Sequence, residues 1–160
     1  MRLIFRIAGG ARLVLTSEAV ATMRSFAQHR WWQAEAGGVL LGRHLLESSD
    51  IVVDEVTAPQ AKDRRTRLSF FRSKQHDAIA RAKWKEAHST MAYLGLWHTH
   101  PQEDPTPSGV DRRDWERAIA ADTFEGNRLF FPIVGTHRIR VWSKTRTGPI
   151  KELLLEGEQE

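Results

Sequence analysis

The alternation of apolar and polar residues along the chain predicts more strands than helices. Short apolar or alternating runs bounded by turn residues are typical of strands, and apolar residues spaced three and four positions apart are typical of helices. We expect one helix that begins at Thr16 or Ser17 and runs to about Trp32, a second from Ser73 to about His88, and a third after Ser108. The expected strands cover residues 2–7, 12–15, 37–46, 51–57, 91–98, 128–134, 138–143 and 150–155.

These elements favour a mixed α/β fold built from layers. Several expected strands follow one another directly, so the chain lacks the strict strand–helix alternation of a doubly wound fold. Turns are expected at Gly9-Gly10 and Gly135-Thr136, and loops at residues 59–69 and 101–107. The tryptophans expected to pack in the interior or between the layers are Trp31, Trp32, Trp84 and Trp97.

The length and composition indicate one globular domain that covers residues 1–160. No apolar run approaches the roughly 18–20 residues that cross a bilayer. Arg2 and Arg6 interrupt the apolar N-terminus, which argues against a signal peptide. Cysteine is absent, so disulfides and thiolate ligands are excluded and a cytoplasmic location is expected. Any metal ion in this protein must therefore be held by His, Asp, Glu and water.

The chain is mildly basic, with a formal net charge of +4, and its cations are densest at residues 62–67, Lys-Asp-Arg-Arg-Thr-Arg. Two interpretations of this segment stay open: a solvated loop, or a surface for an acidic partner. Aromatic residues do not alternate with these charges in a stacking pattern, so nucleic acid is not an expected partner.

The richest chemistry lies in Trp97-His98-Thr99-His100-Pro101. Alternate residues of a strand point to the same face, so His98 and His100 project together. Two imidazoles placed in this way can bind one metal ion, and zinc accepts nitrogen and oxygen ligands. An H-x-H pair also occurs by chance on exposed edge strands, so this pair alone does not establish a site.

Asp111 is the natural third ligand, because a proline-rich loop can turn the chain back toward the histidines. Catalytic zinc sites use three protein ligands and leave one position for water. Ser108-x-x-Asp111 also matches a helix N-cap with an acidic residue in the first turn. The two roles are compatible, because a capping Ser108 can still direct its hydroxyl into the site.

A candidate proton carrier lies upstream, in Glu35-Ala36-Gly37-Gly38. A glutamate before a glycine pair and a buried strand is well placed at the edge of a pocket, and glycines allow close backbone approach. A carboxylate beside an activated water can take its proton and pass it to a leaving amine. The alternative is a glutamate that faces solvent.

Together these residues resemble the JAMM, or MPN-plus, metallopeptidase family. Its signature is an upstream glutamate, H-[ST]-H-P, and an S-x-x-D that is separated from the second histidine by seven residues. His98-Thr99-His100-Pro101, Ser108 and Asp111 match this spacing without gaps. The order of elements is similar over nearly the whole chain, which implies a curved sheet flanked by about three helices.

The resemblance implies one Zn²⁺ per chain, held by His98, His100 and Asp111. It also implies Glu35 as general base and acid, and Ser108 as a donor to the oxyanion. The implied activity is zinc-dependent hydrolysis of a bond between a carboxyl-terminal tail and an amine. The implied substrate is a protein conjugated through that tail, ubiquitin-like or a nucleotidyltransferase.

Short bacterial members of the family look most similar to this chain. Some of these accompany activating and conjugating enzymes in antiphage operons, including CBASS systems, and no membrane partner is implied. Asp104-Pro105-Thr106-Pro107-Ser108 is also similar to a RadC-like, nucleic-acid-associated branch. A non-catalytic MPN-type binding module is the third interpretation, and such modules usually lack the ligand set.

Two further features stay open. Asp114 either orients a ligand histidine or is a solvated carboxylate, and residues 67–71 either border a groove for a peptide tail or form a buried edge. The histidines expected to be structural or on the surface are His29, His44, His76, His88 and His137.

Overall fold

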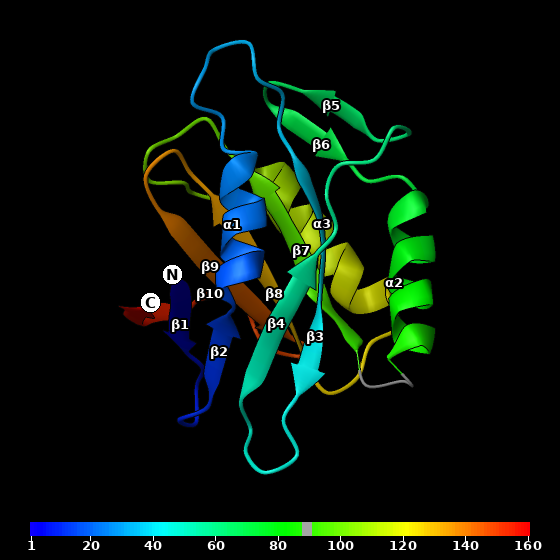
Figure 1. Cartoon of the computed structure of the whole chain (residues 1–160), viewed down its shortest axis with the longest axis vertical. Helices are drawn as coiled ribbons and strands as arrows, with labels where there is room; N and C mark the ends of the chain where they lie inside the picture. The colour runs from blue at the N-terminus through cyan, green and yellow to red at the C-terminus, as the bar shows by residue number, and fades with distance from the viewer. Residues whose placement is uncertain (88–90) are drawn as a thin grey trace.

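The chain folds into a nine-stranded mixed β-sheet with helices on both faces, as a computed structural model that describes residues 1–87 and 91–160 shows (Figure 1). The mixed α/β class expected from the sequence is therefore confirmed. The helices are α1 (Ser17–Ser25), α2 (Gln75–Glu86) and α3 (Gly109–Ala121). The strands are β1 (Arg2–Arg6), β2 (Arg12–Leu15), β3 (Gly37–His44), β4 (Ile51–Val56), β5 (Arg64–Thr66), β6 (Ser69–Phe71), β7 (Ala92–Thr99), β8 (Arg128–Val134), β9 (Ile139–Thr145), β10 (Lys151–Glu152) and β11 (Leu154–Gln159).

The large sheet has the order β10-β9-β8-β7-β3-β4-β2-β1-β11, and β5 and β6 form a separate hairpin. The pairs β2–β4 and β7–β8 are parallel, and the others are antiparallel. The two central strands, β3 and β7, are buried along most of their length. Their adjacent ends carry the residues of the predicted site.

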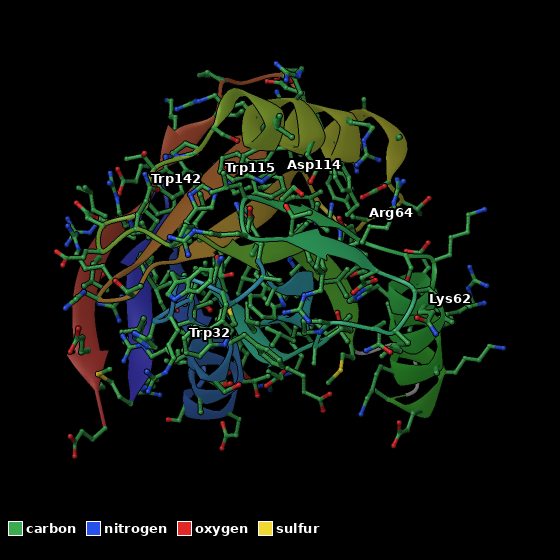
Figure 2. The ribbon with its side chains drawn as sticks, turned by 90° about the horizontal axis from the view of Figure 1, so that it is seen from above. Trp32, Lys62, Arg64, Asp114, Trp115 and Trp142 are labelled. Atoms are coloured by element: carbon green, nitrogen blue, oxygen red, sulfur yellow. The ribbon has the colours of Figure 1, made fainter. Side chains whose placement is uncertain are left out.

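The sheet separates two apolar cores, because neighbouring residues on a strand face opposite sides. Phe130 packs in the core beneath α1, and Phe131 packs in the core beneath α3. Figure 2 shows α1 and α3 on opposite sides of the strands. Trp115 anchors α3, because its ring stacks on Phe131 at a centroid distance of 4.9 Å. This packing fixes α3, and with it Asp111 one turn earlier.

The first helix ends at Ser25, so its predicted extension to Trp32 is wrong. The tertiary contacts of the next residues explain the early end. Phe26 packs against Trp97, and the buried amide of Gln28 donates to the backbone carbonyls of Gln33 and Arg67. These bonds hold residues 26–34 as an ordered loop.

The basic segment contains more structure than predicted, since β5 lies within it and pairs with β6 in a hairpin. The second helix begins at Gln75 with Lys74 as its N-cap, so the predicted cap, Ser73, lies one position before the observed one. Ser73 Oγ nevertheless accepts a bond from Gln75 N–H at 3.3 Å, and its own backbone N–H donates to Asp63. The predicted end of this helix at His88 lies outside the described residues.

The predicted burial of the tryptophans is correct for Trp97, which is fully buried. It is wrong for Trp31, Trp32 and Trp84, which are 76%, 61% and 44% exposed. A further observation concerns membranes: the described residues contain no helix that is both long and apolar enough to span one.

Candidate metal centre

The pairing of β3 with β7 brings the upstream glutamate to the histidine motif. Gly37 lies opposite His98 in this antiparallel pair. The pairing continues one residue further, because Thr99 N–H donates to the carbonyl of Ala36 at 2.9 Å. Glu35 is the next residue along and therefore lies across from His100. Segments more than 60 positions apart in the sequence thus meet at one end of the sheet.

His98, His100 and Asp111 converge as the sequence predicts. The two Nε2 atoms are 3.1 Å apart, and the Asp111 oxygens lie 3.2 Å from His98 Nε2 and 3.1 Å from His100 Nε2. Ligand atoms at about 2.0–2.1 Å from a tetrahedral zinc ion lie about 3.3 Å from one another. The observed spacing and the nitrogen and oxygen donors therefore fit a divalent metal ion.

Asp111 reaches the histidines from the first turn of α3. Ser108 is the N-cap residue: its Oγ accepts a bond from Asp111 N–H, and its N–H donates to Asp111 Oδ2. The capping role expected for Ser108 is thus present, and its hydroxyl lies beside a candidate ligand. Among the described residues, this hydroxyl donates no hydrogen bond, so its proton is free to meet an oxygen in the site.

Glu35 is buried, with only 4% of its surface exposed. A ligand-type oxygen of this residue and the Nε2 or Nδ1 atoms of His98 and His100 all lie within 4.8 Å of one another. A spacing of this size can be bridged by one water molecule. Burial is the main reason that the pKa of Glu35 rises to about 7. A carboxyl group with such a pKa can both accept and release a proton near neutral pH.

The backbone of Glu35 is held by the β5–β6 hairpin. Glu35 N–H donates to the carbonyl of Thr66 at 2.8 Å, and Arg65 Nε donates to the carbonyl of Glu35 at 2.7 Å. On the other side, Gly38 lies so close to β4 that an added Cβ would meet the carbonyl oxygen of Thr57 at 2.2 Å. The glycine pair therefore serves close backbone approach.

Thr99 also holds this segment, through its side chain. Its Oγ1 accepts a bond from Ala36 N–H at 2.9 Å and donates to Gln28 Oε1 at 2.8 Å. Gln28 in turn binds the carbonyl of Arg67 in the hairpin. This network joins the histidine strand, the Glu35 segment and the hairpin. Sequence reasoning missed Gln28, because nothing local distinguishes it from a helix-surface residue.

The two histidines have different electrostatic surroundings. Burial lowers the pKa of His98, which favours the neutral imidazole that binds metals. Burial also acts to lower the pKa of His100, but the bond to Asp111 and the charge of Asp111 outweigh it and raise the pKa. Gln102 Oε1 accepts bonds from His100 Nδ1 at 3.0 Å and from Thr106 N–H at 3.2 Å. In the neutral form of His100 that donates from Nδ1 to Gln102, Nε2 carries no proton and is the atom that can bind a metal ion.

The Asp111 carboxyl is ionised in this setting. Burial acts to raise its pKa, but the hydrogen bonds from His100, His98 and the Ser108 backbone outweigh burial and hold the pKa far below its usual range. An anionic carboxylate between two imidazoles is the charge pattern that a divalent cation requires.

Asp114 does not orient a histidine, so that interpretation is wrong. Its carboxylate pairs with Arg72, at 2.7 Å, and with Arg117. Burial acts to raise the pKa of Asp114, but the charge and hydrogen bond of Arg72 outweigh it, so the pKa falls. The pair with Arg72 ties α3 to the residue that follows the hairpin. Figure 2 shows Asp114 on α3 and Arg64 on the neighbouring hairpin.

A cleft of about 1180 Å³ opens beside this centre. Glu35, His98 and Asp111 line it together with Phe70 and Phe71 of β6. Of residues 67–71, Phe70 and Phe71 therefore border a cleft, and the remaining walls include residues of β3, β7, α2 and α3.

The other histidines that the structure describes contribute nothing to this centre. His76 is buried and structural, with Thr57 bonded to Nδ1 at 2.6 Å and Asp63 to Nε2 at 2.8 Å. His29 and His137 are exposed, and His44 is half-buried at the far end of β3. His88 lies outside the described residues.

The fold and the ligand pattern define a JAB-type domain, and comparison with known proteins identifies the family. A model of the prokaryotic homologues of the JAB domain matches residues 16–145, so the chain belongs to that family. The resemblance inferred from the sequence is confirmed.

Several curated relatives carry the same name, CD-NTase/cGAS isopeptidase. A protein from Pseudomonas aeruginosa strain BWHPSA011 is 38% identical over 109 residues, which cover 68% of each chain. A protein from Escherichia coli strain TW11681 is 30% identical over 142 residues, which cover 88% of this chain and 86% of the relative. The solution structure of protein DSY2949 from Desulfitobacterium hafniense has the same fold, with a TM-score of 0.61 and 21% identity over 86% of this chain and 87% of that one.

Proposed function

We propose that this chain is a zinc-dependent isopeptidase that cleaves the bond between the carboxyl-terminal carbonyl of a CD-NTase and an amine. The observation that carries the proposal is the convergence of two imidazole nitrogens and a carboxylate at 3.1–3.2 Å beside the buried Glu35. The names of the relatives support the choice of substrate.

His98, His100 and Asp111 hold the zinc ion in this proposal. A zinc ion in such a site lowers the pKa of a water molecule and polarises a carbonyl group. Gln102 fixes the ring of His100, and Ser108 fixes the carboxylate of Asp111 through the capping box. Bonds of this kind to ligand side chains set their orientation and typically matter about 10- to 100-fold in affinity or activity.

Glu35 moves the proton. Its carboxylate takes a proton from the attacking water as the new C–O bond forms, and it gives that proton to the nitrogen as the C–N bond breaks. The pKa of about 7 suits both steps. The free hydroxyl proton of Ser108 stabilises the negative charge that develops on the carbonyl oxygen, a role worth about 100- to 1000-fold in rate.

The cleft accepts the tail that precedes the scissile bond. Phe70 and Phe71 of the hairpin face Val110 and Arg113 of α3 around it. Apolar and charged walls on both sides suit an extended peptide, because its side chains alternate between the two sides. A folded body of the substrate then remains outside the cleft.

The test is cleavage of a CD-NTase fused at its carboxyl terminus to a reporter protein. Glu35→Gln is expected to lower kcat by about 100- to 10,000-fold, because it removes the proton carrier. The same variant is expected to keep its zinc. The matched control is Glu47→Gln, since Glu47 is exposed in the turn after β3 at the far end from the site. Full activity of Glu35→Gln would overturn the mechanism.

A further inference from the structure

An exposed aromatic turn lies next to the segment that carries Glu35. Arg30 to Gln33 form a tight turn, in which Gln33 N–H donates to the carbonyl of Arg30 at 3.0 Å. Trp31 and Trp32 occupy its two central positions and are 76% and 61% exposed. Leu68, at the tip of the β5–β6 hairpin, is 76% exposed. Large apolar side chains that are exposed next to one another mark interaction sites.

The turn and the hairpin tip form one surface. Arg67 Nη1 donates to the carbonyl of Trp31 at 2.7 Å, and the buried amide of Gln28 links the start of the turn to the carbonyl of Arg67. Figure 1 shows the loop before β3 beside this hairpin. We call Trp31, Trp32 and Leu68, with the neighbouring Arg30 and Arg67, the aromatic patch.

The aromatic patch is ordered before any partner arrives. The rings of Trp31 and Trp32 meet edge to face at a centroid distance of 6.0 Å, and the guanidinium of Arg30 lies 5.5 Å from the centre of the Trp32 ring. Arg30 N–H also donates to Gln33 Oε1 at 2.8 Å. Aromatic side chains on an ordered turn lose little conformational freedom on binding, which is why tryptophan is common among the strongest contacts of interfaces.

The charge around the aromatic patch has one sign. Residues 26–34 and 64–72 contain five arginines and neither aspartate nor glutamate. Arg30, Arg64 and Arg67 are exposed there. A complementary partner therefore presents an apolar spot with carboxylates around it. The edge-to-face packing of the two indoles gives no flat platform for successive bases, so a protein fits better than a nucleic acid.

We infer that the aromatic patch is a docking surface for the folded body of the protein whose tail is cleaved. The argument rests on the proposed function and on continuity with the site. Two residues after the turn comes Glu35, and the hairpin that carries Leu68 binds the Glu35 backbone and lines the cleft through Phe70 and Phe71. A folded protein whose tail occupies the cleft has its acidic, apolar face against this patch.

Kinetics on two substrates test the inference. The first is the CD-NTase–reporter fusion, and the second is a short peptide of the same tail with a fluorogenic amide. Trp31→Ala with Trp32→Ala is expected to raise KM for the fusion by about tenfold or more and to leave kcat within about twofold. The same variant is expected to cleave the peptide as well as the wild type does. Leu154→Ala is the control, since Leu154 is 70% exposed on the edge strand β11.

Direct binding separates this inference from the proposed function. If the wild type cleaves neither substrate, the isopeptidase proposal fails, and the patch is then judged by binding of the unconjugated CD-NTase to immobilised protein. The docking surface is supported if the double variant loses that binding, if the wild type binds more weakly at high salt, and if Leu154→Ala binds as the wild type does. The inference is overturned if the double variant loses activity equally on fusion and peptide, or if its KM and its binding are unchanged. It is also overturned if the two tryptophans instead mediate a dimer in sedimentation, or if they bind an oligonucleotide without any effect on cleavage of the fusion.

Discussion

Removal of one hydroxyl group, in Thr99→Val, tests the network that positions Glu35. Valine has the same shape and is also favoured in strands, so the change removes two hydrogen bonds and little else. Ala36 N–H loses its acceptor, and Gln28 Oε1 loses its donor. Ala36 and Thr99 are fully buried, and Gln28 is 3% exposed, so water cannot replace either partner in the folded chain.

The magnitude follows from these two groups. An unsatisfied buried polar group costs about 1–3 kcal/mol, so the loss of both partners is expected to lower the free energy of unfolding by about 2–6 kcal/mol. For a chain of this size the melting temperature is then expected to fall by about 4–24 °C. Urea unfolding with a chelator present measures the loss without a contribution from bound metal.

Two further readouts distinguish positioning from general stability. Amide hydrogen exchange of Ala36 is expected to accelerate, and kcat for the peptide is expected to fall at a temperature where the variant is folded, with zinc content unchanged. Thr147→Val is the control, because Thr147 is exposed and its hydroxyl makes no hydrogen bond among the described residues. A loss below about 0.5 kcal/mol, within the range of ordinary surface substitutions, would refute the reasoning.

Two other predictions concern stability. Gly95 lies in β7 at φ +147°, and an added Cβ would meet the carbonyl oxygen of Phe130 at 1.9 Å. Gly95→Ala is therefore expected to lower the free energy of unfolding in urea by about 3 kcal/mol. An unchanged urea midpoint would contradict this prediction. Burial acts to raise the pKa of Asp63, but bonds from Gln60, His76 and Ser73 outweigh it and lower the pKa. The stability that ionised Asp63 contributes is therefore present above the unfolded pKa of about 4 and lost as pH falls through the folded pKa. At pH 7 the free energy of unfolding of Asp63→Asn should be lower than that of the wild type, and this difference should disappear below about pH 4. A difference of constant size from pH 7 to pH 3 would show that the charge is not involved.

The candidate ligand set could be predicted from the sequence because the placement of each of its residues depends on local structure. The period of a strand places His98 and His100 on one face, and the N-cap pattern places Asp111 in the first turn of a helix. The position of Glu35 could not be predicted from local structure, because only the pairing of β3 with β7 shows that Glu35 lies across from His100. Its burial could not be read from the Glu-Ala-Gly-Gly segment alone.

The errors lie where long-range contacts override local preference. Residues 26–32 contain no helix breaker, and yet the helix stops because Gln28 turns its amide toward Thr99 and Arg67. The hairpin has strands of three residues, too short for a clear period, and its bonds to the Glu35 backbone help to hold it. Hydrophobicity alone predicts that Trp31 and Trp32 are buried, and it cannot detect that the turn from Arg30 to Gln33 leaves both side chains exposed.

Zinc binding to chelator-stripped protein, measured by calorimetry and by metal analysis after dialysis, tests the central claim most directly. The account predicts about one zinc ion per chain for the wild type and for Glu35→Gln, and loss of that ion in His98→Ala and in Asp111→Ala. Glu35→Gln must then be loaded with metal and yet inactive. A wild-type chain that retains no zinc, or a His98→Ala variant that retains it fully, would contradict the account.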